Sequence, residues 1–357
     1  MKLAIRPNLS SFRRRPESSV ARLRDKKPTT FLTKTIVGFI CSLSLALDSG
    51  LRRNDGLKMH ILALLVLVTG FGAYPACAAD KPLHVVASFS ILADMVRQVG
   101  GDDVVVTSLV APDADTHAYQ PTTEDAKSLA KADLIVVNGL GFEGWMQRLS
   151  VASGTKGVIV VASVGITPRT MTEDNRRITD PHAWQDLANG RIYVKNIAAA
   201  LEKAAPEHAP AFRVRAARYE AELVKVDQEV RKQLADIPLA QRKIITSHDA
   251  FGYFGAAYGV AFLAPVGIST ESEPSASDVA RLVTQIKAEG VREVFIENMT
   301  NAKLIEQIAK DAGAEVGGTL YSDALSLPTG PAPTYLAMFS NNVPKLRAAM
   351  LRSQKNR

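Results

Sequence analysis

From Asp80 onward, short apolar runs alternate with amphipathic segments of helical period. Leu83–Phe89 (LHVVASF) has the length and β-branched content of a buried strand, and ILADMVRQVGG after it has apolar residues at helical spacing before two glycines. The same alternation returns after residue 240, from KIITSH to a C-terminal helix near Pro333–Leu351. Strands that alternate with helices usually pair in parallel, so we predict an α/β fold.

Between the two alternating regions lies a segment of almost continuous helical pattern, from about Gly190 to Leu239. Its second half runs for about 27 residues without glycine or internal proline, which would span ~40 Å as one helix. We predict a first α/β lobe at residues 80–205, a linking helix at 206–239 and a second α/β lobe at 240–357. Ligands bind such sheets at the carboxyl ends of the strands, so we expect the binding groove between the lobes.

The chain before Asp80 carries an export signal. The stretch MHILALLVLVTGFGAYPACAAD combines a preceding lysine, a short apolar core, helix-breaking residues and a small-residue cleavage site, so we expect residues 59–79 to be a signal peptide and the mature protein to be periplasmic. The apolar core is too short to span a membrane. Lipid attachment at Cys77 is the less favoured alternative, because lipoprotein cleavage usually requires leucine where Tyr74 stands.

Residues 1–58 precede this signal peptide, although a signal peptide normally begins at the start of translation. The codons of Ser10–Ser19, read on the opposite DNA strand, can encode nearly the sequence of Leu47–Asp55, as an inverted repeat would. We predict that residues 1–58 are a spurious or non-structural N-terminal extension and that translation begins at Met59. The alternative is a second anchor at Thr35–Leu47, which at 13 residues is shorter than the roughly 20 that cross a bilayer.

The net charge changes sign when these segments are set aside. The full chain carries 43 Lys and Arg against 36 Asp and Glu, a net charge of +7. Residues 1–58 hold 13 of the basic and 4 of the acidic residues and residues 59–79 hold none, so residues 80–357 carry 30 basic and 32 acidic residues, a net charge of −2. We therefore predict no nucleic-acid or membrane-surface partner.

Both cysteines, Cys41 and Cys77, also precede Asp80, so a metal site in the mature chain must use histidine and carboxylate ligands.

Residues 139–144 (GLGFEG) form a G-x-G-x-x-G pattern after the apolar run DLIVV. A dinucleotide-binding turn of this kind needs an acidic residue about 20 positions later, at the end of the next strand, to bind the ribose. Here the next apolar run ends at Ser163 and no acidic residue follows until Glu173. We therefore interpret the glycines as a strand-to-helix turn with Trp145 packed beside it.

Three histidines and one aspartate have similar settings, at strand ends or in loops that face the expected groove. They are His117 in PDADTHAYQPTTED, His182 in TDPHAWQD, His248 directly after KIITS and Asp323 in LYSDALS, two in each predicted lobe. Together they predict a four-ligand metal site. The remaining histidines are expected to be structural, solvated or removed with the signal peptide: His60, His84 and His208.

Three imidazoles and one carboxylate suit Zn²⁺, which binds four such ligands tetrahedrally at about 2.0–2.2 Å. Mn²⁺ or Fe²⁺ prefers more oxygen ligands and a higher coordination number. A bound imidazole usually donates its second N–H to a carboxylate or carbonyl. The candidates for that supporting role are the acidic residues near the ligands: Asp115, Asp180, Asp249 and Glu297.

These stretches resemble the cluster A-I (cluster 9) solute-binding proteins of bacterial ABC transporters for zinc and manganese. The resemblance covers nearly all of the mature chain. It rests on DTHAYQPTTEDAKSLAKADLIVVNGLGFEGWM, DPHAWQD, TSHDAFGYFGAAYGV with GISTESEPSASDVARL, and ENMTNAKLIEQIAKDAG with YSDALS. It implies a periplasmic binding protein of two similar lobes, each a parallel sheet flanked by helices, joined by one long backbone helix, with the metal between the lobes.

The ligand pattern of the family falls on His117, His182, His248 and Asp323. The third position is commonly histidine in zinc carriers and glutamate in manganese carriers, so the resemblance favours Zn²⁺ as the transported ion, with Mn²⁺ or Fe²⁺ as alternatives. Many zinc carriers insert a loop rich in histidine before the second ligand. Here the corresponding stretch TPRTMTEDNRRITDPH has no histidine before His182, so we predict no such metal-gathering loop.

The resemblance implies that the metal is cargo. We therefore expect a monomer that is not an enzyme and that delivers the ion to the membrane permease of an ABC importer. A secreted zinc hydrolase is the alternative from another class, with three protein ligands, an open site and a general base such as Glu297 or Asp249. It is disfavoured because the sequence has no H-E-x-x-H or similar compact ligand pair. An adhesin is a third possibility, for which the sequence carries no specific motif.

Overall fold

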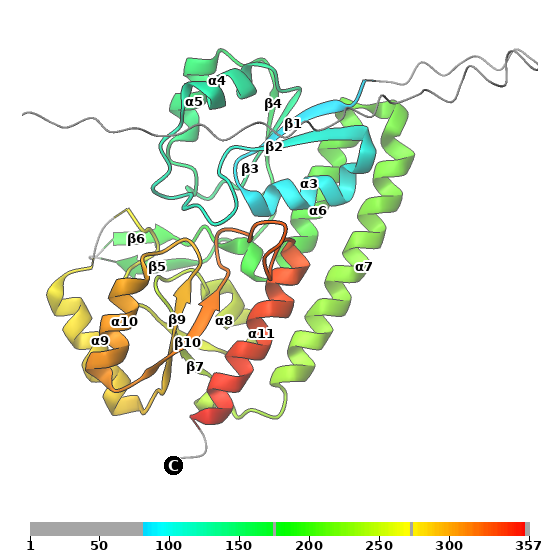
Figure 1. Ribbon diagram of the computed structural model, residues 1–357. Helices are drawn as coiled ribbons and strands as arrows, with labels where there is room; N and C mark the ends of the chain where they lie inside the picture. The colour runs from blue at the N-terminus through cyan, green and yellow to red at the C-terminus, as the bar shows by residue number, and fades with distance from the viewer. Residues whose placement is uncertain (1–80, 174–175, 272–273, 354–357) are drawn as a thin grey trace, which may run out of the picture. The chain divides into compact units, whose positions relative to one another are not determined.

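The computed structural model describes residues 81–173, 176–271 and 274–353 (Figure 1). The predicted N-terminal extension (1–58) and signal peptide (59–79) lie outside the described residues. Within the described ranges, no helix is both long enough and apolar enough to cross a bilayer.

The first lobe is built on a four-stranded parallel sheet with the strand order β2-β1-β3-β4. The helices of this lobe cover both faces of the sheet, with α3 and α6 on one side and α4 and α5 on the other (Figure 1). Strand β3, the apolar run LIVV, is buried along its whole length, as expected for a strand covered on both faces. The elements in chain order are β1 (Leu83–Ala87), α3 (Ser90–Gly100), β2 (Val104–Ser108), α4 (Thr123–Ala130), β3 (Leu134–Val137), α5 (Met146–Ser153) and β4 (Val158–Val161).

The second lobe has a four-stranded parallel sheet with the order β10-β9-β7-β8. When the strands of each lobe are numbered in chain order, both sheets have the order 2-1-3-4, so the two lobes share one topology and the prediction of two similar lobes is confirmed. The elements are β7 (Lys243–Ile245), α8 (Gly252–Tyr258), β8 (Ala261–Leu263), α9 (Ala276–Glu289), β9 (Glu293–Glu297), α10 (Ala302–Ala312), β10 (Glu315–Leu320) and α11 (Tyr335–Arg352).

An antiparallel hairpin of β5 (Thr170–Glu173) and β6 (Arg176–Thr179) was not predicted from the sequence. Its strands have four residues each, and β6 is mostly exposed, so they lack the apolar alternation that marks a half-buried strand. The hairpin falls within the residues expected for the first lobe, yet the N–H of Arg169 just before it donates to the Tyr253 hydroxyl of the second lobe. A 3-10 turn (Ala183–Gln185) and α6 (Leu187–Ala204) follow.

The predicted long helix is α7 (Ala209–Leu234), a single helix of 26 residues, or ~39 Å. It packs against α3 and α6 of the first lobe and against α8 and α11 of the second (Figure 1). The Arg215 guanidinium donates to the carbonyls of Val99 and Gly100 at the end of α3. One helix therefore spans both lobes.

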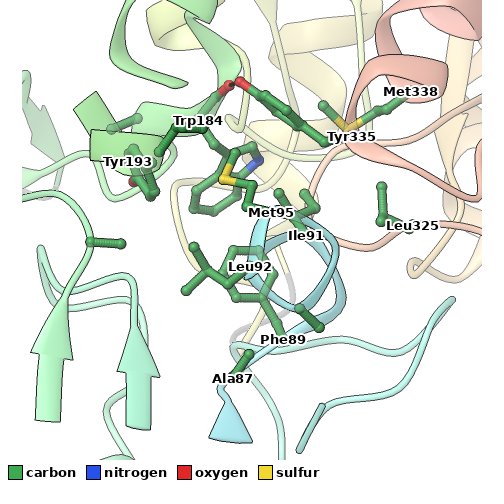
Figure 2. Close-up of a cluster of buried hydrophobic side chains, with 14 of the residues drawn as sticks. Ala87, Phe89, Ile91, Leu92, Met95, Trp184, Tyr193, Leu325, Tyr335 and Met338 are labelled. Atoms are coloured by element: carbon green, nitrogen blue, oxygen red, sulfur yellow. Dashed lines mark hydrogen bonds between the residues drawn. The ribbon is translucent and has the colours of Figure 1, made fainter. Parts of the chain in front are cut away.

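The main apolar core is continuous across both lobes (Figure 2). Phe89 and Leu92 from the first lobe, Trp184 and Tyr193, and Leu325 and Tyr335 from the second lobe belong to the same buried cluster. The Tyr335 hydroxyl donates to the Trp184 carbonyl, and glycine is needed at position 190 because a Cβ there would lie 2.7 Å from that hydroxyl oxygen. A smaller second core lies inside the second lobe, around Ile245, Val294 and Ile308. The shared core ties the two lobes together beside their ligand-bearing loops.

Candidate metal centre

The structure brings together all four residues predicted as ligands. His117, His182, His248 and Asp323 each offer one ligand atom, and these atoms lie within 4.8 Å of one another. His117 is 8% exposed and the other three residues are 0% exposed. Two of the residues come from each lobe, at or beyond the carboxyl ends of the strands. The site is enclosed, where the sequence analysis predicted a groove, because loops from both lobes close over it.

The ligand atoms are spaced for a single ion. Oδ2 of Asp323 lies 3.1 Å from Nε2 of His248, 3.3 Å from Nε2 of His117 and 3.6 Å from Nε2 of His182. The Nε2 atoms of His117 and His182 are 3.2 Å apart. A tetrahedral ion with bonds of about 2.05 Å requires its ligand atoms to be ~3.3 Å apart. Four of the six separations are therefore close to that requirement, and the other two, from Nε2 of His248 to Nε2 of His117 and of His182, lie within 4.8 Å.

His117 lies in the loop between β2 and α4. The Asp115 carboxylate accepts the backbone N–H of His117 at 2.9 Å, and Trp145 Nε1 donates to the carbonyl of Thr116 at 3.0 Å. Trp145 is buried beside the turn that follows β3, as the sequence analysis predicted. The loop then ends at Thr122, which caps α4 through a reciprocal hydrogen-bond pair with Asp125.

His182 follows the β5–β6 hairpin. Oδ1 of Asp180 lies 2.9 Å from both the backbone nitrogen and Nδ1 of His182, so this carboxylate fixes the backbone and the ring together. The Asn138 side chain donates to the Pro181 carbonyl at 2.9 Å. With Nδ1 occupied, Nε2 faces the other ligands.

His248 lies just beyond β7 and is held by the end of the neighbouring strand β9. Oε1 of Glu297 accepts the backbone N–H of His248, and Oε2 lies 2.8 Å from its Nδ1.

Asp323 follows β10. The preceding carbonyl, of Ser322, accepts hydrogen bonds from Trp184 Nε1 at 2.8 Å and from the Gln185 amide at 2.9 Å. The segment that carries His182 is thus hydrogen-bonded directly to the segment that carries Asp323.

Two of the four predicted supporting carboxylates, Asp180 and Glu297, face Nδ1 of a ligand imidazole. The expectation for Asp115 is wrong: its carboxylate bonds the backbone N–H two residues later, a common local geometry for aspartate, and not the ring of His117. The expectation for Asp249 is also wrong, since among the described residues its carboxylate forms no ion pair with a ligand ring. Asp249 instead lines a pocket with Asp180 and Arg169, and burial raises its pKa.

The charges of the site are strongly coupled. Burial lowers the pKa of His182, but the negative charge of Asp323 and the hydrogen bond to Asp180 outweigh burial and raise this pKa to about 9. Burial also lowers the pKa of His248, but the charges of Glu297 and Asp323 outweigh burial and raise this pKa well above its usual value. Burial raises the pKa of Asp323, but the two positive imidazoles hold it well below its usual range. In His117, burial dominates and lowers the pKa. The centre is therefore a site where a cation is favoured.

Of the three histidines predicted to lie outside the site, His60 is outside the described residues, and His84 and His208 lie away from the site. His84 is on β1, and Nδ1 of His208, just before α7, lies 3.3 Å from Oδ1 of Asp103. Neither belongs to the buried cluster.

Two α/β lobes of one topology that enclose a cluster of imidazoles and a carboxylate define a two-lobed metal-binding protein. Residues 85–349 match the family described as ZnuA, zinc-uptake complex component A, periplasmic, and the chain belongs to this family. The family consists of the substrate-binding proteins of metal ABC transporters, which are not enzymes, so the hydrolase alternative is set aside. The predictions of family and of a non-enzymatic, metal-binding role are confirmed.

The relatives differ in the metal that their names give. The chain is 34% identical over 304 residues to the manganese-binding lipoprotein MntA of Bacillus subtilis (strain 168), covering 83% of this chain and 99% of MntA. It is 34% identical over 266 residues to the iron-binding protein YfeA of Yersinia pestis, covering 74% of this chain and 85% of YfeA. The solved structure of the periplasmic zinc-binding protein TroA of Treponema pallidum superposes with a TM-score of 0.72 at 31% identity, covering 76% of this chain and 99% of TroA.

Proposed function

We propose that this protein captures Zn²⁺ between its lobes and delivers it to the membrane permease of an ABC importer. The ligands are Nε2 of His117, His182 and His248 and the carboxylate of Asp323. The observation that carries this proposal is the convergence of four buried ligand atoms, two from each lobe, within 4.8 Å. The protein supplies all four ligands and leaves no position for an attacking water, as a carrier requires.

The donor set supports zinc. Three neutral imidazoles and one carboxylate match the tetrahedral preference of Zn²⁺, and the third ligand is the histidine that the family resemblance associates with zinc. One observation favours Mn²⁺ or Fe²⁺ as the alternative cargo. Oδ1 of Asp323 is buried and has no hydrogen-bond partner in the described part of the chain, so it offers a fifth ligand atom of the hard type.

Release follows from the division of the ligands between the lobes. His117 stands before α7 in the chain and His248 and Asp323 stand after it, while the His182 segment is hydrogen-bonded to residues of both lobes. A small movement of one lobe against the other would therefore separate His117 from His248 and Asp323. Capture and release then need no change in the ligands themselves, and the affinity depends on how firmly the lobes are held together.

The proposal includes export. The mature protein begins near residue 80, is soluble in the periplasm and acts as a monomer. The rival arrangement is a lipid anchor at Cys77, and the relative MntA is named as a lipoprotein. Intact mass and N-terminal sequence of the protein recovered from the cell envelope distinguish the two. A diacylglyceryl mass on Cys77 would contradict soluble export, and peptides from residues 1–58 would contradict a start at Met59.

The metal is tested on the protein purified from the periplasm without added metal. Elemental analysis is expected to find about one zinc per chain, and calorimetric titration is expected to give tighter binding for Zn²⁺ than for Mn²⁺ or Fe²⁺. The variants His117→Ala and His182→Ala should lose affinity by orders of magnitude and remain folded, whereas His84→Ala serves as the matched control outside the site. Full occupancy by manganese or iron in the native protein would overturn the choice of zinc, and wild-type affinity in both variants would overturn the ligand assignment.

A further inference from the structure

The turn between β3 and α5 lies at the carboxyl end of the strand next to β1 and reaches the metal centre. It contains the G-x-G-x-x-G pattern of residues 139–144, which has no role in the proposed function. Gly139 and Gly141 have φ angles of 81° and 85°, in the region that glycine adopts without strain. The chain therefore reverses tightly here before α5 begins.

The centre of this turn is filled by its own acidic residue. The Glu143 carboxylate accepts the backbone N–H of Asn138 at 2.6 Å and that of Gly139 at 3.2 Å, and the Ser88 hydroxyl donates to it at 2.6 Å. In a nucleotide-binding turn, free N–H groups of this kind bind a phosphate. Here the Glu143 side chain takes that place, which closes the turn.

The closed turn is hydrogen-bonded to the segment that carries His182. The Asn138 amide donates to the carbonyl of Pro181, the residue before His182, and its Oδ1 accepts the hydroxyl of Tyr193 from α6. Both Asn138 and Tyr193 are fully buried. The position of the turn is thus fixed relative to the backbone that carries His182.

Phe142, at the end of the turn, contacts both ligands of the first lobe. Its ring centroid lies 4.8 Å from that of His117 and 5.9 Å from that of His182, with interplanar angles of 82° and 72°. Phe142 is 2% exposed and also packs against Phe89 and Trp184. These contacts leave Phe142 little freedom to move, so it acts as a fixed wall for the two imidazoles.

His117 depends on this wall more than the other imidazoles do. Nδ1 of His182 and Nδ1 of His248 each face a carboxylate, whereas among the described residues no carboxylate lies within ion-pair distance of Nδ1 of His117. The hydrogen bonds of the His117 loop hold its backbone and not its ring. At Nε2 this ring contacts two other members of the site, His182 and Asp323. Away from Nε2, its orientation is supported by the edge-to-face packing of Phe142.

We infer that Phe142 and Glu143 are positioning residues for metal capture. Glu143 closes the turn, and the turn holds Phe142 against His117 and His182, so that their Nε2 atoms stay 3.2 Å apart before the ion arrives. This inference rests on the proposed role of both histidines as ligands. The physical benefit is preorganisation, since rings that are already oriented lose less conformational freedom when the ion binds.

The test compares Phe142→Leu and Glu143→Gln with Phe212→Leu, in the mature protein. Phe212 is a fully buried phenylalanine on α7, away from the ligands, and gives the matched control. The readouts are the Zn²⁺ affinity, the visible absorption spectrum of bound Co²⁺, which reports the ligand geometry, and the melting temperature without metal. Phe142→Leu is expected to weaken Zn²⁺ binding about tenfold, the range seen for residues that support metal ligands, and to change the Co²⁺ spectrum.

Glu143→Gln keeps one carbonyl acceptor in the turn, so it is expected to shift both readouts in the same direction by a smaller amount. Phe212→Leu is expected to lower only the melting temperature. If Phe142→Leu does not fold, Phe142→Met, which retains more side-chain volume, replaces it. The inference is overturned if the folded Phe142 and Glu143 variants keep the wild-type affinity and Co²⁺ spectrum. A failure of the proposed function is distinct, because it would show as wild-type binding in His117→Ala and His182→Ala.

Discussion

Oδ2 of Asp323 in the second lobe lies 3.3 Å from Nε2 of His117 in the first lobe, and their side chains are 0% and 5% exposed. This pair spans the junction between the lobes at the point where the proposed ion lies. An ion bound there joins the lobes through bonds stronger than any hydrogen bond between them.

The first prediction is that Zn²⁺ stabilises the folded protein by an amount that grows with the logarithm of its affinity. At a free concentration of 100 times the dissociation constant, binding adds about 2.7 kcal/mol to the free energy of unfolding. Differential scanning calorimetry with Zn²⁺ and with a chelator should show the increase in melting temperature. Asp323→Ala should abolish the increase and His84→Ala should retain it. A full increase in Asp323→Ala would mean that the ion binds elsewhere.

The second prediction concerns the carboxylates that hold the imidazoles. Asp180→Asn and Glu297→Gln should each weaken Zn²⁺ binding by about 10- to 100-fold, because each removes the negative charge facing Nδ1 of a ligand. Asp249→Asn is the control, since this neighbouring carboxylate does not contact a ligand ring. Competition titration with a fluorescent chelator measures the affinities. Equal losses in all three variants would show that only the total charge of the region matters.

The third prediction is a pH dependence of capture. The pKa of His182 is raised to about 9 and that of His248 is raised as well, so both imidazoles carry protons at neutral pH in the metal-free protein. Zn²⁺ must displace these protons, so its affinity should rise as the pH increases from about 6 to about 9. Calorimetry in two buffers with different heats of ionisation should detect proton release at neutral pH. Binding without proton release, at an affinity independent of pH, would contradict the charge states proposed for the site.

The fourth prediction is that the Thr270–Asp115 hydrogen bond slows metal release. The Thr270 hydroxyl of the second lobe donates to Oδ2 of Asp115 at 2.6 Å, and Oδ1 of the same carboxylate holds the backbone of His117. A hydrogen bond to a charged group contributes ~1.5–3 kcal/mol, so Thr270→Val should speed release to a chelator about tenfold or more in stopped-flow experiments. Thr284→Val, an exposed change within α9, is the control. Identical release rates in wild type and Thr270→Val would exclude this contact from the opening step.

The fifth prediction concerns stability away from the metal. Glu293 on β9 is buried and pairs with Arg352 in the last turn of α11. Arg352→Ala leaves the carboxylate buried without this partner, which should lower the free energy of unfolding by ~1–3 kcal/mol in urea denaturation. Adding Glu293→Gln should recover part of the loss, because an uncharged amide is less costly to bury. No recovery in the double variant would assign the loss to the packing of the Arg352 side chain.

The strands and helices were largely predictable from the sequence because their signals are local. The run LIVV of β3 and the helix α7 need only apolar spacing and the absence of glycine and proline to be recognised. The β5–β6 hairpin was missed since its short polar strands carry no such spacing. Arg169, just before the hairpin, is hydrogen-bonded to Tyr253 of the second lobe. Its position could not be inferred without the neighbouring lobe.

The four candidate ligands were also proposed from the sequence, because His117, His248 and Asp323 follow predicted strands and His182 stands in a loop beside Pro181. Parallel strands place their carboxyl ends at one edge of each sheet, which is where ligands bind. The supporting residues were predictable only in part. Asp115 and Asp180 both stand two residues before a ligand histidine, yet only Asp180 contacts the ring. That difference depends on side-chain rotation in the folded loop, which the spacing of residues does not determine.

The sequence by itself determined the α/β class, the two lobes and the residue types of the metal site, since these follow from periodicity along the chain and from ligand chemistry. The tertiary structure alone decided that the ligands are enclosed and that Phe142 lies against two of them. It also decided that the G-x-G-x-x-G turn is closed by Glu143. Such contacts join segments that are distant in the chain or depend on three-dimensional packing, and no local pattern in the sequence records them.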